Sequence, residues 1–274
     1  MSDIEIIVAT MNQKDLSLFE KMNAQTDILI SNQNKEYCYE EKTMNDCLVR
    51  MISTGTKGVG INRNIGLQNS KADILLLADD DIVYHDNYAE IIREAFEKIN
   101  DADVIIFRMR FIKNGKVYDV DKHKTRRLSM RNGLSFGTYQ IAIRKKSMER
   151  ANLHFTHLFG GGTIYSSGED SLFLIDCFRA GLKVYSYEGL IGDNIRDSST
   201  WFNGFNEKFF YDRGAFIACA FPKQRYLISL YYVYVYMRKK ENNIKGIKMW
   251  KMMQAGFKGY KKLMTYEEWK KYDG

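Results

Sequence analysis

The chain has 274 residues, 45% of them hydrophobic and 27% charged, with a formal net charge of +7 at pH 7. This length and apolar content suffice for one large α/β domain, with or without an appended segment. No apolar run approaches the roughly 18 residues of a membrane span, and no basic-then-apolar segment opens the chain, so we expect a cytoplasmic protein. The four cysteines lack CxxC spacing and a His-rich neighbourhood, which argues against disulfides and zinc.

The first third of the chain alternates between strand and helix patterns. Strands are predicted over residues 4–10, 27–32 and 47–54, and a helix over 14–23. A strand, a helix and a further strand in this order are typical of a parallel sheet. Gly58-Val59-Gly60 then gives a flexible entry to a helix that carries Arg63 and Asn64.

Three consecutive carboxylates, Asp79, Asp80 and Asp81, follow the apolar run 73–78. Such a run predicts a strand covered on both faces. Like charges this close favour a hard cation, Mg²⁺ or Mn²⁺. The alternative is a solvated acidic turn that complements the dipole of a helix beginning near Asp86.

Ligands of parallel sheets bind beyond the carboxyl ends of the strands. That rule selects Thr10, Asn32 and the acidic triplet, which end three separate predicted strands. Arg63, with the backbone N–H groups of its helix start, suits a nucleotide or diphosphate. Its alternative role is an ion pair that anchors the triplet. For His85, an exposed turn is favoured over metal binding.

Further elements are predicted downstream. They are strands over 104–109 and 139–144, a hairpin turn at Asn114-Gly115, a short helix over 145–152, and a basic loop with Arg126, Arg127 and Arg131. The loop either binds phosphate or is simply solvated.

A second cluster consists of the glycines at 160–162 and then Gly168-Glu169-Asp170, which opens an apolar helix. Consecutive glycines allow close approach to a ligand, or merely a loose connection. Acids at a helix N-terminus ordinarily complement its dipole. From the residues alone, both interpretations stay open.

The order of these motifs resembles that of the family 2 glycosyltransferases, over roughly residues 3 to 200. The motifs are a strand, an Arg-Asn-x-Gly helix (63–66), an apolar strand, the triplet 79–81 and Gly168-Glu169-Asp170. The resemblance implies the α/β GT-A fold, with helices on both faces of a mainly parallel sheet. It also implies inverting transfer from a nucleotide-sugar, with the triplet as the DxD-type metal motif.

The resemblance also implies residue roles. Asp170 is the expected catalytic base, and Glu169 positions the acceptor or shapes the pocket. The expected donor-binding residues are Thr10, Asn32, Arg63, Asp79 and Asp80, and the expected metal ligands are Asp81, Asp79 and Asp193.

Two positions depart from the family pattern. Asn32 stands where family members commonly have an acid that contacts uracil, so a UDP-sugar is favoured but not fixed. No His follows the strand after the Asp170 helix, and Asp193 is the oxygen ligand that could replace it. Farther on, Trp201 either stacks on a sugar or packs in the core.

The chemistry follows from charge. A sugar hydroxyl is a poor nucleophile, so a carboxylate must take its proton during attack, and we expect Asp170 to do so. A divalent cation would stabilise the negative charge that develops on the leaving nucleoside diphosphate. Direct displacement inverts the anomeric centre.

The positive charge is concentrated at the end of the chain. Residues 223–274 contain thirteen Lys or Arg against four Asp or Glu, so we predict a basic helical extension over 223–274. The catalytic domain is predicted over 1–222, with its donor half at about 1–100 and its acceptor half at about 101–222. Aromatic residues 226–237 beside basic faces suit an anionic bilayer, or else pack on the core while the lysines are solvated. No nucleic-acid-binding signature is present.

The sequence therefore predicts a glycosyltransferase of cell-surface (capsular) polysaccharide assembly, peripheral on the inner face of the membrane, with a glycan or lipid-linked acceptor. One alternative is a metal-dependent nucleotidyl or phosphoryl transferase, although no GxxxxGK[ST] loop is present. The other is a degenerate GT-A domain that binds a membrane or a partner through its tail.

Overall fold

The computed structural model describes residues 2–195 and 204–272. Contacts divide the chain into two compact units, residues 1–156 with 170–198, and residues 157–169 with 199–274. The boundary predicted between residues 222 and 223 lies inside the second unit, because helix α6 (Glu207–Ala220) packs against α8 (Gly246–Lys262). Each unit is described by itself.

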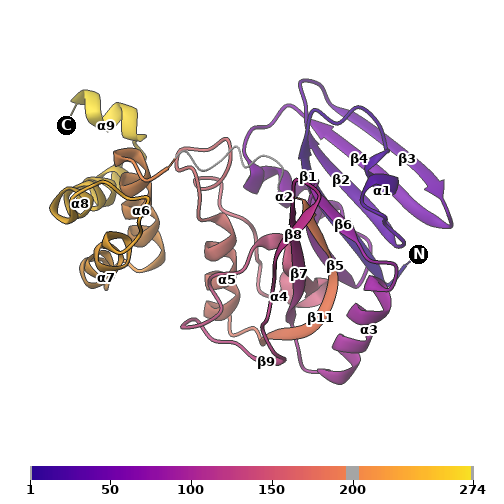
Figure 1. Ribbon diagram of the computed structural model, residues 1–274. Coiled ribbons are helices and arrows are strands. Elements are labelled where there is room, and N and C mark those ends of the chain that lie inside the picture. The colour runs from indigo at the N-terminus through magenta and orange to yellow at the C-terminus, as the bar shows by residue number, and fades with distance from the viewer. Residues whose placement is uncertain (1, 196–203, 273–274) are drawn as a thin grey trace. The chain divides into compact units, whose positions relative to one another are not determined.

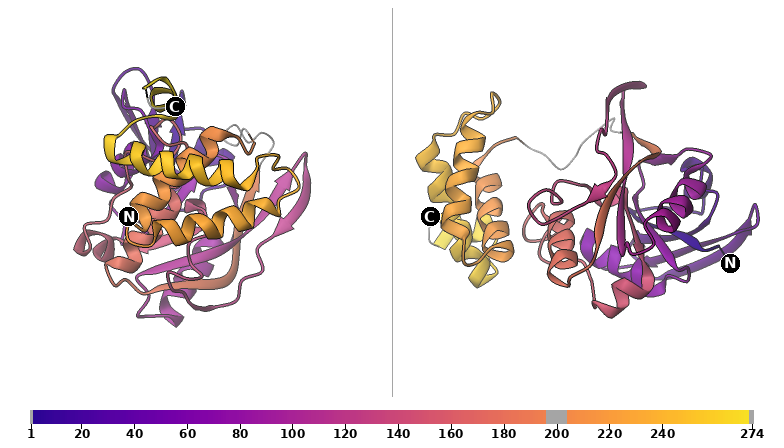
Figure 2. Two further views of the ribbon diagram at one scale, coloured as in Figure 1. Left: turned by 90° about the vertical axis from the view of Figure 1, so that its left-hand side faces the viewer. Right: turned by 90° about the horizontal axis from the view of Figure 1, so that it is seen from below.

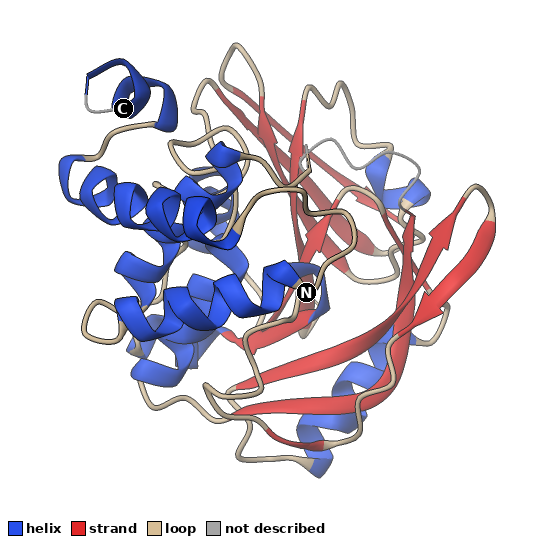
Figure 3. Ribbon diagram, turned by 60° about the vertical axis from the view of Figure 1, so that its left-hand side comes forward, coloured by secondary structure: helices blue, strands red, loops and turns tan. Residues whose placement is uncertain are grey.

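The first unit is built on one sheet, which contains eleven strands among the described residues. They are β1 Ile4–Met11, β2 Asp27–Gln33, β3 Cys38–Met44, β4 Cys47–Thr54, β5 Ile74–Asp79, β6 Ile82–Tyr84, β7 Val104–Lys113, β8 Lys116–Val120, β9 Arg126–Arg127, β10 Ile141–Arg144 and β11 Val184–Ile195. Their order is β3-β4-β2-β1-β5-β10-β7-β11-β6, with β8 paired to β7 and β9 to β11. The strands are drawn as arrows in Figure 1 and are red in Figure 3.

The strand ends meet as the carboxyl-end rule predicts. Strand β1 runs parallel to both β2 and β5, and β2 runs parallel to β4. In this register Thr10 lies opposite Asn32, and Ala9 lies opposite Asp79. Between β5 and β7 the antiparallel strand β10 interrupts the parallel pattern.

Helices cover both faces of the sheet. Ile92 and Phe96 of α3 (Tyr88–Lys98) join the core on one face, and Phe173 of α5 (Glu169–Arg179) and Leu67 of α2 (Val59–Asn69) join the core on the other. Helix α4 (Lys145–Arg150) adds Met148 to this second core. The predicted α/β fold class is confirmed.

The helix predicted over residues 14–23 is mostly wrong, because only Leu18–Lys21 (α1) is helical. The Asp15 carboxylate accepts a hydrogen bond from the backbone N–H of Ser17. Local side-chain bonds of this kind offer the backbone an alternative to the helical ladder.

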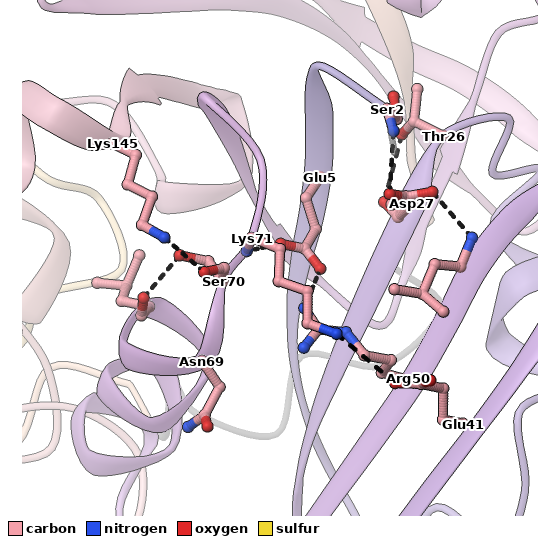
Figure 4. Close-up of polar contacts among 12 residues, drawn as sticks. Ser2, Glu5, Thr26, Asp27, Glu41, Arg50, Asn69, Ser70, Lys71 and Lys145 are labelled. Atoms are coloured by element: carbon pink, nitrogen blue, oxygen red, sulfur yellow. Dashed lines mark hydrogen bonds and ion pairs between the residues drawn. The ribbon is translucent and has the colours of Figure 1, made fainter.

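A buried ion pair ties the strands together away from the ends just described. Arg50 of β4 donates to Glu5 of β1 at 2.5 Å across β2, and both side chains are at most 3% exposed. The backbone N–H of Lys71 donates to the same carboxylate, while Asp27 accepts from Ser2 and from the backbone of β4 (Figure 4). These contacts hold β1, β2 and β4 in register.

The second unit is helical. Besides α6 and α8 it contains α7 (Arg225–Met237) and α9 (Tyr266–Tyr272), and α6, α7 and α8 lie side by side (Figure 2). Helices α6 and α8 approach closely because Gly256 faces the backbone of Tyr211, where an added Cβ would lie 2.0 Å from the carbonyl oxygen. None of the described helices is both long and apolar enough to cross a bilayer.

Candidate active site

The acidic triplet lies at the end of β5. Asp79 is the last residue of that strand, and Asp80 and Asp81 form the turn into β6. The Thr10 hydroxyl, at the end of the neighbouring β1, donates to Oδ2 of Asp80 at 2.5 Å. Two of the predicted site residues are thus in direct contact.

Helix α2 is fixed over these strand ends by two asparagines. Asn62 donates to the carbonyl oxygens of Thr10 and Ser31, at 2.9 and 2.8 Å. Asn64 exchanges two hydrogen bonds with the backbone of Phe155. The helix also begins close to the segment at 155–156, because an added Cβ on Gly60 would lie 2.1 Å from the Thr156 carbonyl oxygen.

Arg63, held between these asparagines, joins the two acidic motifs. Its Nη2 donates to Oδ1 of Asp79 at 2.7 Å, and its Nη1 donates to Oδ1 of Asp170 at 3.1 Å. The guanidinium lies over the ring of Phe155, 5.2 Å from its centroid, and the Arg63 side chain is only 5% exposed. The predicted anchoring ion pair is present, and it also reaches Asp170.

Asp170 lies at the start of α5, where its carboxylate is 32% exposed. The Thr138 hydroxyl, from the 3₁₀ helix Thr138–Gln140, donates to the same Oδ1 that Arg63 binds. The neighbouring Glu169 accepts a hydrogen bond from the backbone N–H of Gly168 at 3.1 Å. The sequence offered no signal for Thr138 or Phe155, which belong to no recognisable motif.

The loop before Asp170, residues 157–169, belongs to the helical unit. Asp212 of α6 is buried and accepts from both the backbone N–H and the hydroxyl of Ser166, at 3.1 and 2.7 Å. The rings of Phe159 and Tyr165 pack against Tyr260 of α8. The predicted glycine-rich loop is therefore fastened to α6 and α8.

Asn32 makes hydrogen bonds within the protein. It is fully buried, and its amide donates to the carbonyl oxygen of Gln13 and to Ser53 while its Oδ1 accepts from the backbone N–H of Gln13. Through these bonds the Asn32 side chain fixes the loop after β1. A contact between Asn32 and a nucleotide base stays a prediction.

Asp193 is engaged with two basic side chains. Arg110 binds both of its oxygens, at 2.7 and 2.6 Å, and His85 lies 3.0 Å from Oδ1. Burial raises the pKa of this carboxyl, but the bonds from Arg110 and His85 outweigh it and lower the pKa below its usual value. Metal binding by Asp193 stays a prediction that would require these bonds to rearrange. Trp201 lies outside the described residues.

The charges at the site suit a cation completed by phosphate. Within residues 2–195 and 204–272, no three His, Cys, Asp or Glu side chains form a metal-binding group. Arg63 nevertheless links the carboxylate of Asp79, the first residue of the triplet, to that of Asp170. Mg²⁺ is commonly held by one or two carboxylates with substrate phosphates and water, and these residues fit that mode.

Comparisons with known proteins give the family and the fold. The family model described as glycosyl transferase family 2 matches residues 28–166, half of the chain. The structure is similar to that of S. aureus TarS 1–349 in complex with UDP-GlcNAc, at a TM-score of 0.60 and 13% identity, covering 96% of this chain and 93% of that one. The complex of TarS 1–349 with UDP gives the same TM-score and identity, with 96% and 92% covered.

A structure of S. aureus TarS that is not restricted to residues 1–349 matches with a TM-score of 0.51 at 13% identity, and there 98% of this chain covers 45% of that one. No curated protein matches the chain. The sheet, the Arg63-linked carboxylates and these similarities define a GT-A glycosyltransferase. The chain belongs to glycosyl transferase family 2.

Proposed function

We propose that this glycosyltransferase is metal-dependent and inverting, and that it moves a sugar from a nucleoside-diphosphate donor, with a UDP-sugar favoured, to a hydroxyl of a glycan or lipid-linked acceptor in cell-surface polysaccharide assembly. The observation that carries this proposal is the Arg63 bridge between Asp79 and Asp170. It joins the acid expected to act on the donor side to the acid expected to act on the acceptor.

Asp170 serves as the general base in this proposal. Arg63 and Thr138 both bind its Oδ1, which orients the carboxylate and leaves Oδ2 to accept the proton of an acceptor hydroxyl. The one-third exposure of the side chain gives such a hydroxyl access. General base catalysis contributes about 10²–10⁴-fold to rate.

The donor lies at the carboxyl ends of β1 and β5 in this proposal. Asp79 and Asp81 would hold Mg²⁺ or Mn²⁺ together with the diphosphate, and the ion would stabilise charge on the leaving nucleoside diphosphate. Thr10 orients Asp80 through its hydrogen bond, and Arg63 fixes Asp79. TarS, whose fold is similar, is seen with UDP and with UDP-GlcNAc, which supports a uridine donor.

We place the enzyme at the inner face of the cell membrane. Support comes from the basic, aromatic composition of residues 223–274, which suits a lipid-linked acceptor at an anionic surface. No observation favours the nucleotidyl transferase alternative over glycosyl transfer.

The first test is a thermal-shift screen of nucleoside diphosphates and their sugars, with and without Mn²⁺, because a ligand that binds the native state raises apparent stability. We expect a Mn²⁺-dependent shift with a uridine nucleotide that is lost in Asp81→Ala. The absence of a shift with every nucleotide at saturating concentration would count against the donor site.

Turnover of the donor so identified then tests the base. Asp170→Asn should lower kcat by about 10²–10⁴-fold while nucleotide binding is retained. The matched control is Asp176→Asn on the same helix, where the carboxylate is 49% exposed and pairs with Arg179 at 3.5 Å. A product of retained anomeric configuration, or full activity of Asp170→Asn, would contradict the mechanism.

A further inference from the structure

The outer face of α7 is apolar. Six large hydrophobic side chains of this helix are each at least 52% exposed: Tyr226, Leu227, Leu230, Tyr231, Tyr234 and Met237. At roughly 100° per residue they fall within one sector of about 140° of the helix circumference. Leu227, at 73%, is the most exposed of them.

Folding of the helical unit uses the opposite side of α7. There Ser229 is fully buried, and the ring of Tyr236 packs against Phe205, Phe209 and Phe210. Single exposed hydrophobic residues are ordinary on protein surfaces, but a contiguous set along one helix marks an interaction surface.

Cations flank this face at both ends of the helix. Lys223 and Arg225 lie at its start, and Arg238, Lys239 and Lys240 lie at its end. Arg238 stacks on Tyr234 of the outer face, 4.0 Å from the ring centroid. The partner must therefore accept an apolar helix surface and supply negative charge at both ends.

A second copy of the chain meets only the first requirement. Pairing two α7 helices, parallel or antiparallel, would set cations against cations at each end, and like charges opposed at an interface are unfavourable. An anionic bilayer meets both requirements, because apolar side chains enter the acyl boundary while Lys and Arg contact the headgroups. The phenolic hydroxyls of Tyr226, Tyr231 and Tyr234 suit the interfacial depth.

We propose that the outer face of α7 docks on the surface of an anionic lipid bilayer, with the helix axis parallel to the membrane plane. This docking does not depend on nucleotide-sugar binding or turnover. It assigns to one face of one helix the membrane contact that the composition of residues 223–274 suggests.

The test is flotation of the full-length protein with vesicles of phosphatidylcholine alone, or of an equal mixture of phosphatidylcholine and phosphatidylglycerol, without nucleotide. We expect binding to the anionic vesicles that weakens as salt is raised. Leu227→Ser with Leu230→Ser should lower the partition coefficient at least tenfold. Lys239→Gln with Lys240→Gln should lower it about 25-fold, because each cation contributes about fivefold.

Matched controls come from exposed residues of the first unit. Val117→Ser removes a 51% exposed apolar side chain, and Lys113→Gln with Lys116→Gln removes two exposed cations. Neither change should alter the partition coefficient. All substituted positions are exposed, so circular dichroism of each variant should match that of the wild type.

The proposal is overturned if the wild type does not bind anionic vesicles at low salt, or if the leucine variant binds as the wild type does. It is also overturned if sedimentation shows a dimer that the leucine variant abolishes, since the occupant would then be a second copy. Because these measurements contain no donor, their failure would remove the support for the proposed membrane placement but leave the proposed donor and catalytic base standing. Loss of turnover in Asp170→Asn is equally independent of vesicle binding.

Discussion

Replacing Arg63 with Met removes a cation that Asp79 and Asp170 share, while an apolar side chain of similar length stays over Phe155. Two charge-assisted hydrogen bonds are lost, at 2.7 and 3.1 Å. Such bonds contribute about 1.5–3 kcal/mol each, but both carboxylates are about one-third exposed, so solvent screening reduces this considerably.

The two carboxylates would also repel each other. At a separation on the order of 5 Å, two unit charges interact by about 0.8 kcal/mol in water and about 3 kcal/mol at an effective dielectric constant of 20. Combining the lost bonds with partly screened repulsion, we expect Arg63→Met to lower the free energy of unfolding by about 2–3 kcal/mol. Arg63→Lys keeps the charge but loses the planar fork, and should cost about 1 kcal/mol.

Urea unfolding followed by circular dichroism, which includes the strands of the first unit in its signal, measures these values. Tryptophan fluorescence would not, because the described residues of the first unit contain no tryptophan. A double-mutant cycle with Asp79→Asn supplies the control, since removing one carboxylate should recover about 1 kcal/mol in the Arg63→Met background and none in the wild type. If Arg63→Met unfolds within about 0.5 kcal/mol of the wild type, or if the cycle shows no coupling, the bridge does not hold the site together.

Two further outcomes follow from the packing. Burial lowers the pKa of His123 below 6.5, so the unfolded state binds the proton more readily than the folded state. The stability of the wild type relative to His123→Gln should therefore be fully present above about pH 6.5 and be lost as the pH falls through the lowered pKa. Equal pH profiles of the two proteins in urea unfolding would contradict this. Gly256→Ala inserts a Cβ 2.0 Å from the Tyr211 carbonyl oxygen and should lower the free energy of unfolding by about 2 kcal/mol, measured by tryptophan fluorescence. Lys258→Ala, on the exposed side of the same helix, should lower it by less than about 0.5 kcal/mol.

Elements with a strong local signal were predictable. The apolar run predicted at 73–78 corresponds to β5, which spans Ile74–Asp79. The turn at Asn114-Gly115 joins β7 to β8, with φ of 50° and 69° at its two residues. Strand β3 was missed because its side chains are mostly exposed, so no alternation of apolar and polar residues marks it. Its turn, Asn45-Asp46, has positive φ at both residues, which is a hairpin signal that could have been recognised.

For the site, the carboxyl-end rule brought Thr10 and the triplet together correctly, because neighbouring parallel strands end at the same edge. The bridge from Arg63 to Asp170 joins residues 107 positions apart, and no local pattern encodes such a contact. Thr138 and Asp212 were missed for the same reason. Their roles depend on tertiary packing of single polar side chains.

The attachment of the loop 157–169 to α6 and α8 has a consequence for dividing the protein. Cutting the chain after residue 222 would remove Tyr260, and with it the ring on which Phe159 and Tyr165 pack. The side chains of Thr10, Arg63 and Asp79 would keep their bonds, since all of them lie in the first unit. A chain shortened in this way would therefore keep the contacts around Arg63 and the bonds of Ser166 to Asp212, while the peptide leading into Asp170 would lose its packing on α8.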